Sequence, residues 1–481
     1  MITGLLLLIP LFTALLIFIL KKEELIRKTA FFASLVMFII AIYGSWLFVT
    51  DCSCQWLINL RWIQYLGINL RFGMDGISLL LILLTTFLFP LIILFSWTHT
   101  YHKPSVFYGL VMMMEMAFIG VFTAYNALVF YIFWELALIP AYFICAVWGG
   151  DDRIRITLKF FIYTFVGSLF MLAALIFLYY RTPAPHSFDL IFLYMANLNP
   201  AEQNWIFLAF FITFAVKIPI FPLHTWQPDT YTVSPPEGTM LLSGIMLKMG
   251  TYGLLRFLLP IAPMAVKSWG LPAMILAVIG IIYASVIALR RQDMKRLVAY
   301  SSIAHVGLIA AAILAVNVQA MQGAVIQMFS HGVNIVGLFM IISMIEDRAK
   351  TRNIASLGGI AAQAPWLAIF FMIILLGSIG LPLTNGFVGE FLMLAGLFKF
   401  NVIIASVAGL TIIFSAVYML SMYQKTMYGN RESGEPFPDL TKGEMLTLLP
   451  IILMIFFTGI FPGVFLKITE PAVMEIINLI K

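Results

Sequence analysis

Apolar runs long enough to cross a bilayer recur along almost the whole chain of 481 residues, and they constrain its fold more than any other feature. A membrane span needs about 20 apolar residues, and about 14 such runs lie between residues 2 and 466. Hydrophobic residues make up 62% of the chain and charged residues 10%. A soluble fold of this size could not bury that surplus. We therefore predict an all-α polytopic membrane protein with about 14 transmembrane helices.

Lysine and arginine outside these runs are divided unevenly between alternate loops. Most of them lie in the odd-numbered loops, and the even-numbered loops and the C-terminal tail hold few. Cytoplasmic loops carry an excess of basic residues. We therefore predict that the odd loops face the cytoplasm of a bacterial inner membrane and that both termini lie on the periplasmic side. The same bias accounts for the net charge of +6, so no nucleic-acid partner is expected.

The chain carries no pattern for a redox or nucleotide cofactor. It has three cysteines, too few and too scattered for an iron–sulfur cluster, and no glycine-rich phosphate loop. We expect no cofactor and no metal on this chain.

The longest loops, at about 50–75 and 181–204, belong to the predicted outer side. The second contains residues 188–195 (FDLIFLYM), a pattern that predicts a short amphipathic helix at the membrane interface.

Several ionisable residues lie inside the apolar runs rather than in loops. Such a residue costs several kcal/mol unless it is paired or hydrated, so each is a candidate functional group. At about 1.5 Å per residue, those whose depth can be counted lie roughly 15 Å from a membrane face, near the middle of the bilayer. The candidates are Glu115, Glu135, Lys217, Lys248, His305, His331 and Glu390.

Polar neighbours accompany most of these candidates. Gln327, Ser330, His331 and Asn334 follow i, i+3, i+4, i+7 spacing, which places them on one helix face. Such a stripe can hold water, or it can simply join neighbouring helices by hydrogen bonds. Buried lysines favour the functional interpretation because their burial is costly. Glu115 has no polar stripe beside it.

Prolines interrupt two of the runs next to a charged residue. Pro219 and Pro222 follow Lys217, and Pro382 precedes Glu390 within a run too long for one straight span. Proline and glycine break transmembrane helices where a cavity is lined. Paired breaks in two halves of a chain indicate inverted repeats around an ion site at mid-membrane. Ordinary proline kinks in a packed bundle are the alternative.

These patterns divide the chain into segments. We predict two inverted five-helix repeats, with helices 7 and 12 broken. The predicted segments are 1–104 (helices 1–3), 105–260 (helices 4–8), 261–423 (helices 9–13) and 424–481 (helix 14 and tail).

Several long motifs carry a family resemblance. They are residues 133–140 (FWELALIP), 215–226 (AVKIPIFPLHTW), 246–256 (MLKMGTYGLLR), 293–305 (DMKRLVAYSSIAH) and 387–391 (FVGEF). In this order they resemble the antiporter-like subunits of proton-translocating NADH:quinone oxidoreductase, respiratory complex I. The last motif is most similar to the subunit M branch, because the sister subunits L and N usually have lysine at the position of Glu390.

The resemblance implies a proton-translocating subunit of an enzyme complex, with no redox centre of its own. Glu135 and Lys217 would be a charge pair, and their approach or separation would change the proton affinity of the lysine. Lys248 would be the next relay group, His305 and His331 would continue a hydrated axis, and Glu390 would be the terminal exchange site. NADH, FMN, iron–sulfur clusters and quinone would be held by partner subunits. The implied partners are the other membrane subunits, especially sisters L and N, and the lipid bilayer.

Two positions depart from the family pattern. Tyr231 stands where many relatives have histidine, and Glu237 where many have a small residue. These departures leave the details of the cytoplasmic entrance open.

Three other interpretations share parts of this pattern. A subunit of a multisubunit sodium/proton antiporter has the same charged positions, and a membrane-bound hydrogenase subunit is a close variant. A non-transporting membrane anchor is the third, and it would tolerate mutation of every midplane charge.

Overall fold

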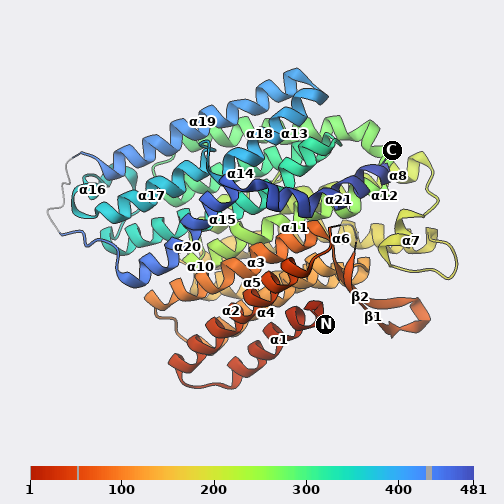
Figure 1. Cartoon of the computed structure of the whole chain (residues 1–481), viewed down its shortest axis with the longest axis horizontal. Coiled ribbons are helices and arrows are strands. Elements are labelled where there is room, and N and C mark those ends of the chain that lie inside the picture. The colour runs from red at the N-terminus through yellow and green to blue at the C-terminus, as the bar shows by residue number, and fades with distance from the viewer. Residues whose placement is uncertain (1, 51–53, 430–435, 481) are drawn as a thin grey trace.

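Long helices running in roughly the same direction make up most of the computed structural model, which describes residues 2–50, 54–429 and 436–480 (Figure 1). In these ranges, 11 helices are long and apolar enough to cross a membrane. They are α1 (Ile2–Ile19), α2 (Glu23–Leu47), α3 (Gly76–Phe95), α4 (Pro104–Thr123), α5 (Ala127–Trp148), α6 (Arg153–Arg181), α13 (Pro263–Leu289), α14 (Met294–Leu314), α15 (Val318–Ala349), α19 (Val402–Met427) and α20 (Lys442–Ile460). The predicted polytopic helical membrane fold is confirmed.

Other parts of the bundle consist of shorter helical pieces. The first part has α8 (Pro200–Lys217) and α9 (Gln227–Val233), and the last has α17 (Pro365–Ser378) and α18 (Asn385–Phe400). Prolines lie in both interruptions, where their missing N–H groups prevent a continuous helix. The middle part alternates α-helical and π-helical pieces: α10 (Pro236–Leu241), η3 (Leu242–Met246), α11 (Leu247–Gly253), η4 (Leu254–Leu258) and α12 (Leu259–Ile261).

An antiparallel hairpin, which we did not predict, occupies the loop at 50–75. Strand β1 (Gln55–Ile63) pairs with β2 (Ile68–Met74), and the short helix η1 (Gln64–Leu66) joins them. Gly67 turns the chain with a φ of 61°, a left-handed conformation that glycine adopts without strain. In Figure 1 the hairpin lies at the same end of the bundle as α7 (Leu190–Tyr194) and the C-terminus; we call this the hairpin end.

Two outer segments complete the hairpin end. Helix α7 falls within the predicted interfacial segment at 188–195, with Leu190 and Leu193 buried and Ile191 exposed. The region after residue 466, which we predicted as a tail, is instead part of helix α21 (Pro462–Ile480). It is helical because buried positions such as Phe465 and Thr469 recur at helical spacing along one face.

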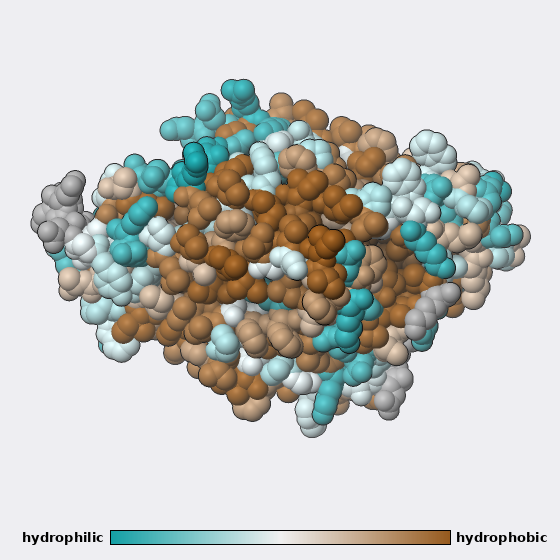
Figure 2. Space-filling model, turned by 90° about the horizontal axis from the view of Figure 1, so that it is seen from above, coloured by the Kyte–Doolittle hydropathy of each residue, from teal (hydrophilic) through white to brown (hydrophobic). Residues whose placement is uncertain are grey.

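Helix α15 is the centre of the bundle. It is buried throughout its apolar length and packs against α3, α14, α17, α18, α20 and α21. In Figure 2, brown apolar surface covers much of the middle of the face, whereas pale or teal polar residues lie near the two ends and in patches along the upper and lower edges. The short helices η2 (Ser96–Thr98), η5 (Ile354–Ser356) and α16 (Ile360–Gln363) lie in connections between the longer ones.

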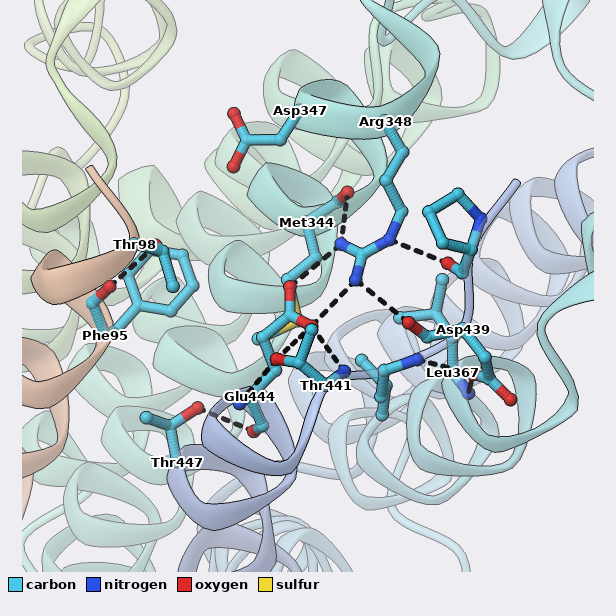
Figure 3. A network of polar contacts seen from close by, with 12 residues as sticks. Phe95, Thr98, Met344, Asp347, Arg348, Leu367, Asp439, Thr441, Glu444 and Thr447 are labelled. Carbon is cyan, nitrogen blue, oxygen red and sulfur yellow. Dashed lines mark hydrogen bonds and ion pairs between the residues drawn. The ribbon is translucent and has the colours of Figure 1, made fainter. Parts of the chain in front are cut away.

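A buried ion pair fixes the end of α15 that is opposite the hairpin end (Figure 3). The Arg348 guanidinium donates hydrogen bonds from Nη1 to Glu444 Oε1 at 2.8 Å and from Nη2 to Glu444 Oε2 at 2.7 Å. It also donates Nε to the Pro438 carbonyl at 2.8 Å, and the Asp439 carboxylate accepts from the backbone N–H of Leu367 at 2.9 Å. Helices α15, α17 and α20 are therefore held together at this end.

Candidate functional site

Lys248 lies on α11, between the two π-helical pieces of the interrupted middle part. Its side chain is buried, with Nζ donating to the Ser243 carbonyl at 2.6 Å. The same Nζ lies 2.9 Å from Nδ1 of His331 on α15. π-Helical turns often mark functional sites, and here they flank the lysine that reaches the central helix.

His331 continues the contact to α14. Its Nε2 lies 3.1 Å from Ser302 Oγ, so the two ring nitrogens connect Lys248 on one side with Ser302 on the other. An ammonium at Lys248 donates to Nδ1, which leaves the ring proton on Nε2 facing the hydroxyl. A proton arriving at Nδ1 can then be matched by a proton leaving Nε2, the arrangement that makes histidine a proton shuttle.

A small polar cavity separates the two histidines. The ring centroids of His305 and His331 are 6.1 Å apart, too far for a direct hydrogen bond. The cavity between them has a volume of about 10 Å³, and Ser301, Gln327 and Asn334 contribute to its lining. This is close to the space one water needs, and the lining supplies polar partners for it.

Glu390, on α18, ends this row of groups. Its Oε1 lies 3.2 Å from His305 Nδ1, and both side chains are buried. Gly380, in the break between α17 and α18, has a φ of 73°, and a side chain at this position would collide with the Glu390 carboxylate. The break between α17 and α18 therefore places the backbone of Gly380 directly against the Glu390 carboxylate.

A larger cavity, of about 590 Å³, adjoins Glu390. Phe387, Phe391 and Lys399 also line it, and Lys399 lies in the last turn of α18. In Figure 1 the chain passes from α18 to α19 at the hairpin end of the bundle. Glu390 thus lies between the histidine row and a cavity that leads toward that end.

The other predicted pair, Glu135 and Lys217, has a looser arrangement. Lys217 is the last residue of α8, where the helix dipole favours a cation. Its Nζ has no hydrogen-bond partner among the described residues and lies 5.1 Å from the centroid of the Trp134 ring. Within the described ranges, no ion pair of 4.0 Å or less joins Lys217 to Glu135, and Glu135 Oε1 is buried without a hydrogen bond.

The remaining candidates occupy separate places. Glu115 is fully buried on α4, and neither carboxyl oxygen finds a hydrogen-bond partner in the described part of the chain. Pro219 and Pro222 lie in the connection from α8 to α9, and Pro382 lies in that from α17 to α18. As for metals, no group of three or more His, Cys, Asp or Glu side chains suited to an ion occurs in the described ranges.

A cluster that sequence reasoning did not assemble lies outside the spans, opposite the hairpin end. His99, in the loop before α4, places Nδ1 3.2 Å from Glu237 Oε1 and Nε2 3.1 Å from Asp347 Oδ2. Tyr101 donates to the other oxygen of Glu237. Burial lowers the pKa of His99, but the hydrogen bonds to Asp347 and Glu237 outweigh it and raise that pKa to about 10.

This cluster joins α10 with α15, the helix that carries His331. Glu237 lies on α10, which leads to Lys248, and Asp347 lies on α15, which carries His331. One signal for this cluster was present in the sequence, the departure of Glu237 from the family pattern. Nothing in the sequence places loop 99–103 beside both helices, so the cluster itself was not predicted.

A second pair that we did not predict is that of Arg256 and Asp75 at the hairpin end. The Arg256 guanidinium forms a buried ion pair with the Asp75 carboxylate, which also accepts a hydrogen bond from the backbone N–H of Ser78 at 2.9 Å. A basic residue inside an apolar run requires such a partner, so Arg256 itself was the available signal.

Comparison with known proteins gives a consistent family. The profile described as "NADH:quinone oxidoreductase/Mrp antiporter, TM" matches residues 124–415. The chain is 41% identical over 461 residues to NADH-quinone oxidoreductase subunit M of Rickettsia conorii, covering 95% of this chain and 93% of that protein. It is 35% identical over 479 residues to NADH-ubiquinone oxidoreductase chain 4 of Marchantia polymorpha, covering 98% and 96%.

Solved structures agree with this result. A chain of respiratory complex I from Thermus thermophilus with bound NADH superposes with a TM-score of 0.92 at 30% identity, covering 100% of both chains. A chain of the Mrp complex from Dietzia shares the fold, with a TM-score of 0.86 at 16% identity, covering 100% of this chain and 98% of that one. The chain therefore belongs to the NADH:quinone oxidoreductase/Mrp antiporter family of membrane subunits, and several of its bacterial relatives are named subunit M.

Proposed function

We propose that this chain is a proton-translocating membrane subunit of a NADH:quinone oxidoreductase. The observation that carries the proposal is the row of buried groups from Lys248 through His331 and His305 to Glu390. Its direct contacts are 2.9 Å and 3.2 Å long, and the space between the histidines is close to what one water needs. Such a row in an apolar bundle has little value for packing, because each ionisable group is costly there.

In this proposal Lys217 is the group that responds to events elsewhere in the complex. Its ammonium has no fixed carboxylate partner, so movement of Glu135 toward or away from it changes its affinity for a proton. A proton released from Lys217 would add positive charge near Lys248. This added charge would drive proton transfer along the row. Glu390 would then release a proton into the cavity toward the hairpin end.

The arrangement in the membrane follows from the same proposal. The 11 long helices and the interrupted parts would together make 14 crossings, with the segments 105–260 and 261–423 as inverted repeats. The hairpin end, with both termini, would face the periplasm of a bacterial inner membrane. NADH, FMN, iron–sulfur clusters and quinone would be held by partner subunits, and sister subunits L and N would be neighbours in the membrane.

The relatives named NADH-quinone oxidoreductase favour this function over sodium/proton antiport, since the Mrp likeness at 16% identity supports the fold alone. The test is redox-driven proton pumping by the reconstituted complex. Lys217→Ala and Glu390→Ala should leave assembly intact and lower the proton-to-electron ratio, whereas Lys267→Ala, at an exposed lysine, should not. Undiminished pumping in both variants would contradict the proposal and favour a membrane anchor.

A further inference from the structure

A cavity of about 520 Å³ lies at the hairpin end, apart from the proton row. It is bounded by β2, α7, η4 and the end of α21, which contribute Arg71, Tyr194, Arg256 and Glu475. Its volume is in the range of small-molecule sites, and charged side chains share the lining with apolar ones. The proposed proton transfer uses none of these groups.

Two arginines on the wall are each held by a carboxylate and keep further donors free. Arg71 pairs through Nη1 with Asp189 Oδ2 at 3.2 Å, and Arg256 pairs through Nη2 with Asp75. The Nε of each arginine is buried without a hydrogen-bond partner in the described part of the chain. Atoms so deeply buried do not themselves reach an occupant of the cavity. Both arginines nevertheless line it, and the Arg71 side chain is 27% exposed, so their other guanidinium N–H groups are placed to donate to an acceptor there.

A phosphodiester fits these donors. It has two charged oxygens that are not bridging, and guanidinium groups are the side chains best suited to binding them. The Arg256 side chain is 6% exposed, so its contact with such an anion would be largely shielded from water.

Glu475 determines which phosphodiester fits best. It is exposed on α21 and lines the same cavity as the arginines. Both arginines already have carboxylate partners, and Glu475 forms no ion pair within the described ranges, so a purely anionic headgroup would meet a third acid. A headgroup that adds a cationic amine would place that amine by Glu475 and its phosphate by the arginines.

The rim of the cavity suits the acyl part of a lipid. Helix α7 turns Leu190 inward, but leaves Ile191 50% and Met195 63% exposed beside the cavity. Tyr125 and Tyr194 also line it, and tyrosine is enriched at membrane interfaces. The polar side chains that would bind a headgroup therefore lie next to apolar side chains that would contact acyl chains.

We propose that this cavity binds a phospholipid of the phosphatidylethanolamine type. Its phosphodiester accepts hydrogen bonds from Arg71 and Arg256, its ammonium lies by Glu475, and its acyl chains leave over Ile191 and Met195.

Photolabelling of the complete reconstituted complex tests this site. A phosphatidylethanolamine carrying a diazirine near the start of one acyl chain should label peptides of α7 and of the end of α21. Glu475→Gln should reduce this labelling about threefold, as expected for loss of one exposed ion pair, and Arg71→Gln should reduce it at least as much. The matched controls Glu470→Gln on α21 and Arg61→Gln on β1, which remove exposed charges outside the cavity, should not change it.

Competition distinguishes the possible ligands. Unlabelled phosphatidylethanolamine should suppress the labelling, whereas phosphatidylglycerol and soluble glycerophosphoethanolamine should suppress it weakly. Equal suppression by phosphatidylglycerol would overturn the role of the amine, and equal suppression by the soluble headgroup would overturn the role of the lipid. Full labelling in Glu475→Gln would likewise overturn the role of the amine. Absence of labelling at α7 and α21, or full labelling in Arg71→Gln, would overturn the site itself.

Discussion

The two halves of the predicted midplane row differ in how their charged groups are held. From Lys248 to Glu390, neighbouring side chains contact one another or share a cavity of about 10 Å³. Around Lys217, the ammonium lies against the Trp134 ring, and no carboxylate is within 4.0 Å of it among the described residues. One half is therefore built as a continuous path, and the other as a pair whose separation can change.

We propose that this difference gives the two regions separate tasks. A continuous row transfers protons whenever its first group gains or loses charge, because each step requires only a small movement. A loosely held ion pair instead responds to the position of its partner, since a charge a few ångströms away shifts proton affinity strongly at low dielectric. Regulation and conduction can thus reside in different halves of one chain.

The largest expected effect comes from a variant that interrupts the row between Lys248 and Glu390. His331→Leu removes both ring nitrogens that connect Lys248 with Ser302. We expect the proton-to-electron ratio of the reconstituted complex to fall by the whole share that this chain carries, because a missing shuttle group slows transfer by about 100-fold or more. His102→Leu is the matched control, since that imidazole is exposed in the loop before α4, and its ratio should stay near the wild-type value. Equal losses in both variants would contradict the distinction.

A second variant separates stability from conduction. Arg348→Ala leaves the buried Glu444 carboxylate without its bidentate partner, and should lower the free energy of unfolding by about 3 kcal/mol. Denaturant unfolding of the purified complex measures this loss, with Lys350→Ala, at an exposed lysine, as the control. The proton-to-electron ratio of the folded complex should not change, because Arg348 is not in the row. A selective loss of pumping with unchanged stability would be the contrary outcome.

The smallest expected effect concerns His99, which joins the helices carrying Lys248 and His331. Burial opposes its charge, but hydrogen bonds to Asp347 and Glu237 raise its pKa from 6.5 to about 10. Because the folded pKa is the higher one, this contribution is complete below about pH 6.5 and is lost as the pH rises through about 10. The stability difference between wild type and His99→Gln, about 1 kcal/mol at its largest, should therefore shrink over that interval in thermal unfolding. A constant difference would show that the imidazolium contributes nothing.

Sequence patterns predicted the level of the row but not its connections. Depth along each helix placed Lys248, His305 and His331 near mid-membrane, because helical rise is regular. Which of them touch depends on which helices are neighbours, and sequence spacing carries no such information. The contact of His305 with Glu390 and the lack of one between Glu135 and Lys217 therefore required the structure.

The same reason explains the features that were missed. The partners of Arg256, His99 and Arg348 lie about 90 or more residues away along the chain. Helix α21 could have been predicted, since Pro462 favours a helix start and its apolar positions recur at helical spacing. The hairpin at 55–74 also has a sequence signal, since apolar Ile58, Leu60 and Trp62 alternate with polar Asn59 and Arg61, which is typical of a strand.

Infrared difference spectroscopy of the turning-over complex tests the continuity of the row most directly. The carboxyl stretch of Glu390, assigned by its loss in Glu390→Gln, should change when the wild-type complex is supplied with NADH and quinone. In Lys248→Met, at the far end of the row, that change should disappear, whereas in Lys267→Met, at an exposed lysine, it should remain. A change of full amplitude at Glu390 in Lys248→Met would contradict proton transfer along this path.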